Sequence, residues 1–398
     1  MGAPIRTHRH AVNNFEIGSI LRQYLERFAI IVGTHKDTIT YVDCFSGPWN
    51  VQSEEFQDSS FSIALEQLRK ARRVHQDRTG RTLRLRCFFL ESNRSAFTKL
   101  KQFTEKIADV EIETQNKRLE HAITLILEFV KKGGSRSFPF MFIDPTGWTG
   151  FEMNTIAPLL KCDPGEVLIN FMTGHIRRFI DYPEEVNQQS FVRLFGSEDF
   201  KEKVKGLAQQ EREDAAVEEY VRNVKTTGNF PYVCSAIVLH PEIDRTAFHL
   251  IYATRSLAGV EVFKDAEKRA MAVMEKARAQ AKQRRREEKT RQAELYSGEI
   301  LHDPNYYTSL RLQYLVKSKQ AILDLLESRN EVAYDQAYAL TLSFSLSWES
   351  DLKEWIRSWV EDGLLTISGL KVRQQVPQRG QGIILVWKGS RARKPTDL

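Results

Sequence analysis

Apolar runs that favour strands alternate with amphipathic helical stretches through the first two-thirds of the chain. The expected strands are residues 39–42, 83–90, 110–114, 138–143 and 166–172. The expected helices between and around them are residues 14–33, 61–73, 94–107, 119–130 and 156–160. Strands that recur every ~30–50 residues with helices between them indicate βαβ units and a parallel sheet. Two later runs, 232–239 and 248–253, are predicted to be antiparallel strands that complete this sheet.

Three of these strands end at an acidic residue. Asp43 ends the first strand and lies in the motif Tyr-Val-Asp-Cys-Phe-Ser-Gly-Pro-Trp. Glu91 directly follows the second strand, and Asp144 directly follows the fourth strand in an Asp-Pro pair. A parallel sheet gathers the carboxyl ends of its strands along one edge, where ligands of open α/β sheets bind. Small residues after Asp43 also let a ligand approach the backbone. The sequence therefore predicts a ligand site at this edge.

Composition is that of a soluble globular protein. Hydrophobic residues make up 41% of the chain and charged residues 28%. Its length of 398 residues is too great for one small core. It has neither an apolar run long enough for a membrane span nor an N-terminal secretory signal, so we expect no membrane association and a cytoplasmic location. The four cysteines are scattered and form no Cys-x-x-Cys pair, which favours reduced core thiols over disulfides or a metal site.

Positive charge is concentrated rather than spread. Residues 268–291 contain ten Lys or Arg and three Glu, a net charge of +7, whereas the whole chain carries +6. A solvated helix or linker accounts for such a segment, and so does a cationic arm for phosphates that includes Arg284, Arg285 and Arg286. Arg177 and Arg178, after the strand at 166–172, are further candidates for phosphate contact.

A second domain begins near residue 305. Its pattern predicts three helices and then two strands joined by a basic, Gly-bearing loop at 371–382, as in a winged helix. The loop carries Lys371, Arg373 and Arg379. Winged-helix domains read DNA and also dock proteins, and both uses stay open. We therefore expect a Rossmann-like domain at 1–265, a basic helical linker at 266–304 and a winged-helix-like domain at 305–398.

The acidic edge has the composition of a nucleotide-cofactor site. An acid after a second strand, such as Glu91, accepts ribose hydroxyls in dinucleotide folds. Asn116, after the third strand, is placed to hydrogen-bond an adenine edge. Asp144-Pro145 would then face the substrate, where a carboxylate accepts a proton or hydrogen bond from a group being alkylated. Trp148 is either a stacking partner for a base or a hydrophobic cap on the sheet.

The motif order resembles class I S-adenosylmethionine-dependent methyltransferases, and more narrowly the three-Cys-motif partner proteins (TcmP), known mostly from bacterial gene neighbourhoods. The segments that carry the resemblance are Tyr41–Pro48, Phe142–Gly147, Val167–Phe171 with Arg177-Arg178, and Phe248–Arg255 with Gly259. The resemblance implies a Rossmann-like core and a companion protein. It also implies S-adenosylmethionine as cofactor, with Asp43, Phe45 and Gly47 in its site.

Two departures from these motifs leave alternatives open. The methyltransferase turn usually reads Gly-x-Gly, and that of TcmP proteins Gly-Pro-Gly, but Trp49 holds the last position here. A Trp does not readily adopt positive φ. Thr146-Gly147 replaces the Pro-Tyr of amino methyltransferases. The alternatives are thus a methyltransferase acting on nucleic acid, a degenerate adaptor that binds nucleic acid or a protein, and a metal-dependent nuclease using the three acids.

Overall fold

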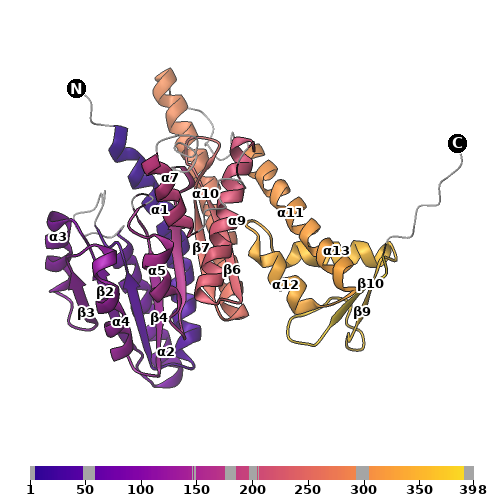
Figure 1. Ribbon diagram of the computed structural model, residues 1–398, viewed down its shortest axis with the longest axis horizontal. Coiled ribbons are helices and arrows are strands. Elements are labelled where there is room, and N and C mark those ends of the chain that lie inside the picture. The colour runs from indigo at the N-terminus through magenta and orange to yellow at the C-terminus, as the bar shows by residue number, and fades with distance from the viewer. Residues whose placement is uncertain are drawn as a thin grey trace, which may run out of the picture. The chain divides into compact units, whose positions relative to one another are not determined.

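The computed structural model describes residues 5–47, 59–145, 147, 149–174, 185–196, 204, 206–292 and 304–389. The chain forms two compact units, Met1–His302 and Asp303–Leu398 (Figure 1). We describe each unit by itself.

A seven-stranded sheet forms the centre of the first unit. Its strands are β1 (Thr38–Asp43), β2 (Arg84–Leu90), β3 (Glu111–Gln115), β4 (Ser137–Ile143), β5 (Glu166–Phe171), β6 (Tyr232–Leu239) and β7 (Thr246–Thr254). They lie in the order β3-β2-β1-β4-β5-β7-β6. Neighbours from β3 to β5 pair in parallel, and β7 is antiparallel to both β5 and β6. The predicted mostly parallel, Rossmann-like sheet is confirmed.

Helices cover both faces of this sheet (Figure 1). They are α1 (Ile5–Gly33), α2 (Ser60–Thr79), α3 (Arg94–Thr104), a 3-10 turn η1 (Leu119–His121), α4 (Ile123–Lys132), α5 (Met153–Leu160), α7 (Glu185–Phe195), α9 (Gln209–Gly228) and α10 (Leu257–Thr290). Helices α1, α2 and α10 pack together on one face, and α4, α5 and α9 on the other. Because both faces are covered, the strands read as nearly continuous apolar runs, as expected of a parallel sheet.

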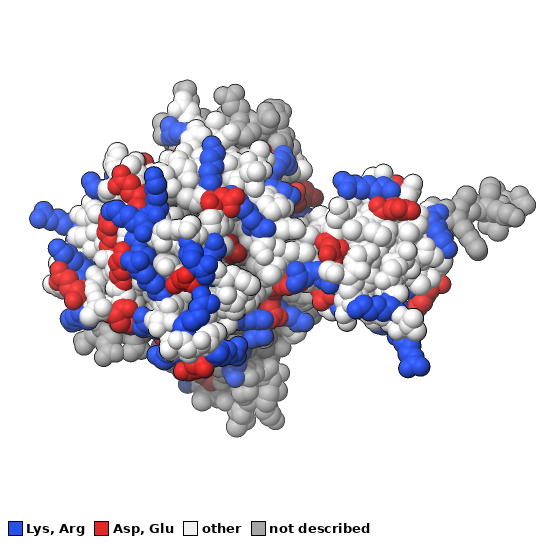
Figure 2. Space-filling view, turned by 90° about the horizontal axis from the view of Figure 1, so that it is seen from below, with Lys and Arg blue, Asp and Glu red and all other residues white. Residues whose placement is uncertain are grey.

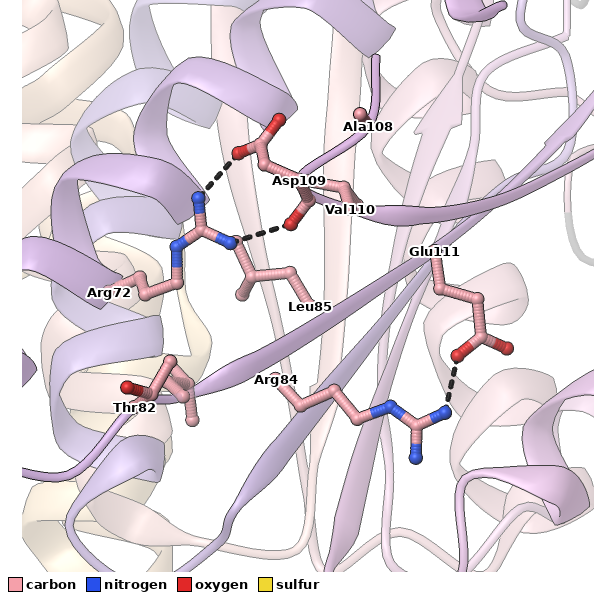
Figure 3. Close-up of a pocket in the computed structure, with 9 residues that line it drawn as sticks. Arg72, Thr82, Arg84, Leu85, Ala108, Asp109, Val110 and Glu111 are labelled. Atoms are coloured by element: carbon pink, nitrogen blue, oxygen red, sulfur yellow. Dashed lines mark hydrogen bonds and ion pairs between the residues drawn. The ribbon is translucent and has the colours of Figure 1, made fainter.

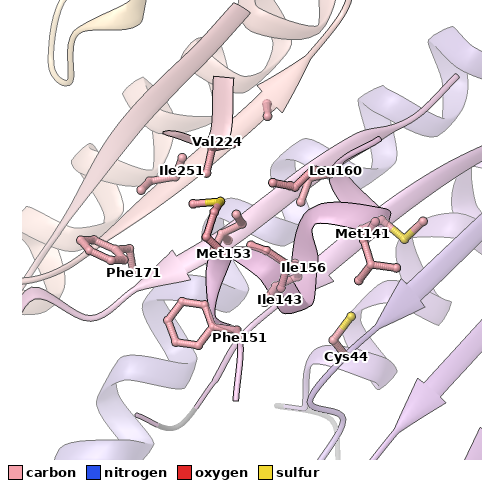
Figure 4. Close-up of a cluster of buried hydrophobic side chains, with 14 of the residues drawn as sticks. Cys44, Met141, Ile143, Phe151, Met153, Ile156, Leu160, Phe171, Val224 and Ile251 are labelled. Atoms are coloured by element: carbon pink, nitrogen blue, oxygen red, sulfur yellow. The ribbon is translucent and has the colours of Figure 1, made fainter. Parts of the chain in front are cut away.

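Side chains of each strand alternate between the two faces. Val42 and Cys44 join the core beneath α4, α5 and α9, which also contains Met141 and Phe171 (Figure 4). Tyr41 points to the other face, where its ring stacks on Phe140 with centroids 6.0 Å apart. Asp43 follows Tyr41 by two residues and therefore lies on that same face, towards α2.

A buried polar cluster fixes α1 and α10 against the sheet near the amino end of β5. The Tyr24 hydroxyl donates to Glu166 Oε2 at 2.5 Å, and the Thr254 hydroxyl donates to Oε1 at 2.8 Å. A Cβ at Gly259 would lie 2.8 Å from Glu166 Oε1 and 2.5 Å from the Tyr252 hydroxyl, so only glycine lets α10 approach this closely. This cluster stands at the edge opposite Asp43.

The basic segment that we assigned to a linker is the continuation of α10. Within it Ala270, Met271 and Met274 are buried, and α10 packs along α1 and β6. Arg278 is 1% exposed and pairs with Asp244 at 2.5 Å, which neutralises part of the charge.

The second unit combines three helices with a small antiparallel sheet. In chain order these are α11 (Asn305–Arg329), β8 (Glu331–Ala333), α12 (Tyr334–Ser343), α13 (Glu349–Glu361), β9 (Leu365–Ser368) and β10 (Ile384–Trp387). The sheet order is β8-β10-β9, with both pairs antiparallel. The three predicted helices and two strands are present, and β8 is an additional short strand that the sequence pattern did not indicate.

Candidate cofactor and substrate site

Strand register brings the three acids to one edge of the sheet. Asp43 ends β1, and it pairs with Phe89 of β2 on one side and with Phe142 of β4 on the other. Glu91 and Asp144 each lie two residues beyond these partners, at the carboxyl ends of their strands. The order of strands reverses at β1 and β4, since the chain runs outward to β3 and then returns to β4. This is the topological switch point at which open α/β sheets bind ligands.

Asp43 is fully buried and hydrogen-bonded. Its Oδ1 accepts the N–H of Phe45 at 3.1 Å, and its Oδ2 accepts the hydroxyl of Ser60, the first residue of α2, at 2.6 Å. Burial raises the pKa of Asp43 to about 7, although the bonds from Ser60 and Phe45 oppose that rise. Because the nearby Asp144 carboxylate also raises the pKa of Asp43, a cation between the two would favour the ionised form.

The raised pKa of Asp43 predicts that Asp43→Asn becomes more stable relative to wild type as pH rises. A carboxyl whose pKa is higher in the folded than in the unfolded protein stabilises the fold while it is protonated. This contribution is fully present below the unfolded pKa of ~3.9 and is lost as the pH rises through the folded pKa of about 7. The amide that replaces the carboxyl never ionises, so we expect the free energy of unfolding of the variant to gain ~2 kcal/mol over wild type between pH 5 and pH 8. Urea unfolding at both pH values measures this gain.

Asp109→Asn is the matched control for this experiment. Hydrogen bonds from Arg69 hold the pKa of Asp109 well below its usual range, so this carboxylate stays ionised in both states from pH 5 to 8. Its replacement should change stability equally at both pH values. A gain for Asp43→Asn no larger than that of the control would contradict the assignment of a neutral-range carboxyl at Asp43.

Glu91 is held in a tight loop at the carboxyl end of β2. The side chain is buried, and its Oε1 accepts the N–H of Asn93 at 2.5 Å. Asn116 donates through Nδ2 to the carbonyls of Glu91 at 2.7 Å and Ser92 at 3.1 Å. The Ser46 N–H, from the turn after Asp43, donates to the Leu90 carbonyl at 2.7 Å. The turns after β1, β2 and β3 are therefore tied together, with Gly47 at the end of the described part of the first turn.

Asp144 lies at the other side of Asp43. It is partly buried, and its Oδ1 accepts the side-chain N–H of Asn170 at 2.6 Å. Burial raises the pKa of Asp144 to about 6, and the bond from Asn170 opposes that rise. Pro145, the next residue in the chain, is buried. Trp148 lies outside the described residues, so its place relative to Asp144 stays a prediction.

Several buried polar atoms near this edge have no hydrogen-bond partner within the described ranges of the chain. They are the Tyr41 hydroxyl, Asn170 Oδ1 and the Thr173 hydroxyl, and each residue is at most 3% exposed. Buried polar groups in proteins are rarely left unpaired without a ligand or ordered water. Sequence reasoning selected none of these three residues, nor Ser60. An asparagine inside the apolar run at 166–172 was the one available signal.

The predicted phosphate-binding residues are distributed over several elements. Arg284 and Arg285 are exposed and Arg286 is partly buried on α10. Lys371, Arg373 and Arg379 are exposed in the β9–β10 loop. Arg177 and Arg178, like Trp49, lie outside the described residues. Seen from below, the surface carries many Lys and Arg side chains with acidic ones between them, rather than one uniform basic face (Figure 2).

A cavity of about 420 Å³ lies at the opposite edge, beside the amino ends of β2 and β3 (Figure 3). Its charged groups are paired: Arg72 with Asp109 at 2.5 Å and Arg84 with Glu111 at 2.5 Å. Because each of these arginines is already paired with an acidic residue, the cavity is a weaker candidate for a ligand site than the acidic edge. Among the described residues, no group of three or more His, Cys, Asp or Glu side chains could hold a metal ion.

Comparisons with known proteins return solved structures of low similarity. No protein-family model matches the chain, and no curated protein matches it. A Legionella pneumophila protein of the family DUF519 is 12% identical, with a TM-score of 0.38 over 64% of this chain and 91% of its own. A Bacillus cereus O-methyltransferase in complex with SAH is 12% identical, with a TM-score of 0.28 over 58% of this chain and 80% of its own. A loganic acid methyltransferase with SAH is 11% identical, with a TM-score of 0.31 over 68% and 84%.

In the part of the chain that the structure describes, no helix combines the length and apolar character needed to cross a bilayer.

Proposed function

We propose that this chain is an S-adenosylmethionine-dependent methyltransferase that acts on nucleic acid together with a companion protein. The companion protein is the part of this proposal that the resemblance to TcmP proteins implies. The observation that carries the proposal is the strand register that brings Asp43, Glu91 and Asp144 to the switch point of the sheet. Buried polar atoms near the same edge that have no partner among the residues that the structure describes are consistent with a ligand there.

The residues at this edge fit the proposed cofactor. Glu91 is a carboxylate acceptor suited to two ribose hydroxyls, and Asn116 has an amide oxygen left for an adenine amino group. Asp43 and Asp144 suit the positive charge that the cofactor carries at its amino and sulfonium groups. The bound cofactor supplies an electrophilic methyl group. This chain supplies the orientation, and Asp144 supplies a base, since its pKa of about 6 leaves it ionised at neutral pH.

The second unit supports nucleic-acid contact through its loop rather than its third helix. The exposed residues of α13 and its end include Glu354, Glu361 and Asp362 against Arg357. Phosphates would repel this face. The β9–β10 loop is basic and is anchored where the N–H of Gly380 donates to Asp335 Oδ1 at 3.1 Å. In this proposal the winged-helix-like unit places that loop against a sugar-phosphate backbone.

Isothermal titration with S-adenosylmethionine at pH 8 tests the proposal. We expect a measurable heat of binding, with affinity falling at pH 5.5 because Asp43 and Asp144 then carry protons. The fall should be larger for S-adenosylmethionine than for S-adenosylhomocysteine, which lacks the sulfonium charge. No heat at millimolar cofactor would reject the methyltransferase and leave the adaptor, whose binding to duplex survives Asp144→Ala.

A further inference from the structure

Asp144 and Asn170 form a side-by-side pair at the ends of two parallel strands. Register pairs Ile143 of β4 with Ile169 of β5, so the next residues of both strands are neighbours on the same face. The two side chains meet through one hydrogen bond of 2.6 Å, donated by Asn170 Nδ2 to Asp144 Oδ1.

This contact fixes which way the Asn170 amide faces. An ionised carboxylate only accepts hydrogen bonds, so the amide nitrogen must face Asp144 and the amide oxygen must face away. That oxygen is buried and has no hydrogen-bond partner in the part of the chain that the structure describes. Among the described residues, the second carboxylate oxygen of Asp144 also has no hydrogen bond. The pair therefore presents two acceptor oxygens, and the second N–H of the Asn170 amide is its one remaining donor.

We propose that Asn170 Oδ1 and Asp144 Oδ2 together select a primary amino group as the methyl acceptor, such as the exocyclic amine of a nucleobase. The inference rests on the proposed function. An amino group has two N–H donors and satisfies both oxygens, whereas a hydroxyl satisfies only one and a carbonyl neither. Sites with buried polar groups discriminate strongly against analogues that leave those groups unpaired.

The transfer step balances with these residues. An N–C bond forms between the amine nitrogen and the methyl carbon while the S–C bond breaks, and the electron pair of that bond stays on sulfur. The nitrogen, now positive, passes one proton to the Asp144 carboxylate, which releases it to solvent. Asn170 exchanges no proton and acts as a positioning residue.

Nucleoside pairs that differ only in the amino group test this inference on the full chain. The probes are adenosine against inosine and cytidine against uridine, titrated at pH 8 by ligand-observed NMR without cofactor. For at least one pair we expect the amine to bind about 10-fold or more tighter than the carbonyl analogue. Asn170→Ala should reduce that ratio to about threefold or less, and Asn223→Ala, which removes a partly buried asparagine of α9, should leave it unchanged.

The outcomes separate this inference from the proposed function. Equal binding within both pairs, or no binding of any nucleoside, overturns amine selection, and the wild-type ratio alone decides this if Asn170→Ala fails to fold. A merely structural role for Asn170 would weaken all four nucleosides equally and leave the ratio intact, which also overturns the inference. Amine preference without heat from S-adenosylmethionine would instead reject the methyltransferase and keep the amine site.

Discussion

Replacing Arg255 with alanine should lower the free energy of unfolding by ~3–5 kcal/mol, because it leaves several buried carbonyls without their charged donor. The guanidinium donates to the carbonyls of Cys162 at 2.9 Å, Gly165 at 3.3 Å and Gly228 at 2.8 Å. It also lies 4.3 Å over the ring of Phe230. One side chain thus joins the start of β5 to the end of α9. Urea unfolding at pH 7 measures the loss.

Two further variants make the Arg255 experiment interpretable. Arg255→Lys keeps the charge, but its compact ammonium cannot span the separate carbonyls, so we expect an intermediate loss. Arg269→Ala removes an exposed arginine that pairs with Asp265 at 3.2 Å on α10 and should cost less than ~0.5 kcal/mol. A loss below ~1 kcal/mol for Arg255→Ala would show that these carbonyls find other partners.

Glu91→Ala should weaken S-adenosylmethionine binding about 100-fold or more, if the methyltransferase proposal holds. Hydrogen bonds to a charged group contribute ~1.5–3 kcal/mol each, and the carboxylate would accept two from the ribose. Isothermal titration measures the change. Because Glu91 also accepts the N–H of Asn93 at 2.5 Å, the melting temperature of the variant must be measured alongside.

The control for Glu91→Ala is a substitution of Glu111, at the amino end of the neighbouring strand β3. Glu111 begins β3 and pairs with Arg84 and Arg86 at the opposite edge of the sheet. Glu111→Gln should leave the cofactor affinity within about twofold of wild type. If Glu91→Ala binds the cofactor within about threefold of wild type, the ribose contact is wrong, and Asp43 and Asp144 alone would then have to account for binding.

The strands of the first unit and their mostly parallel arrangement could be predicted from the pattern of apolar residues. Val-Leu-Ile-Asn-Phe and similar runs are apolar along their whole length, which occurs when helices cover both sides of a strand. Element ends were less secure: α1 extends back to Ile5, and the helix expected at 119–130 is η1 followed by α4, which runs to Lys132. Local propensity changes little at such ends, so tertiary packing decides where a helix starts and stops.

Only some residues of the candidate site could be predicted from the sequence. Asp43, Glu91 and Asp144 could be selected because an acid directly after an apolar run is a local signal. Asn170 gave only the weak signal of an asparagine inside an apolar run, and Thr173 gave none. Their importance depends on which strand neighbours β4 and on whether a buried atom finds a partner.

The sequence by itself determined that this chain builds a parallel, doubly covered sheet with acids at its carboxyl edge, because period and polarity are properties of consecutive residues. Only the tertiary structure decided that Asp43 stands between β2 and β4 and that burial raises the pKa of its carboxyl to about 7. It also decided that Asn170 bonds to Asp144 through its amide nitrogen and leaves its amide oxygen unpaired among the described residues. Strand order, desolvation and hydrogen-bond satisfaction arise between residues far apart in the chain, and no local pattern contains them.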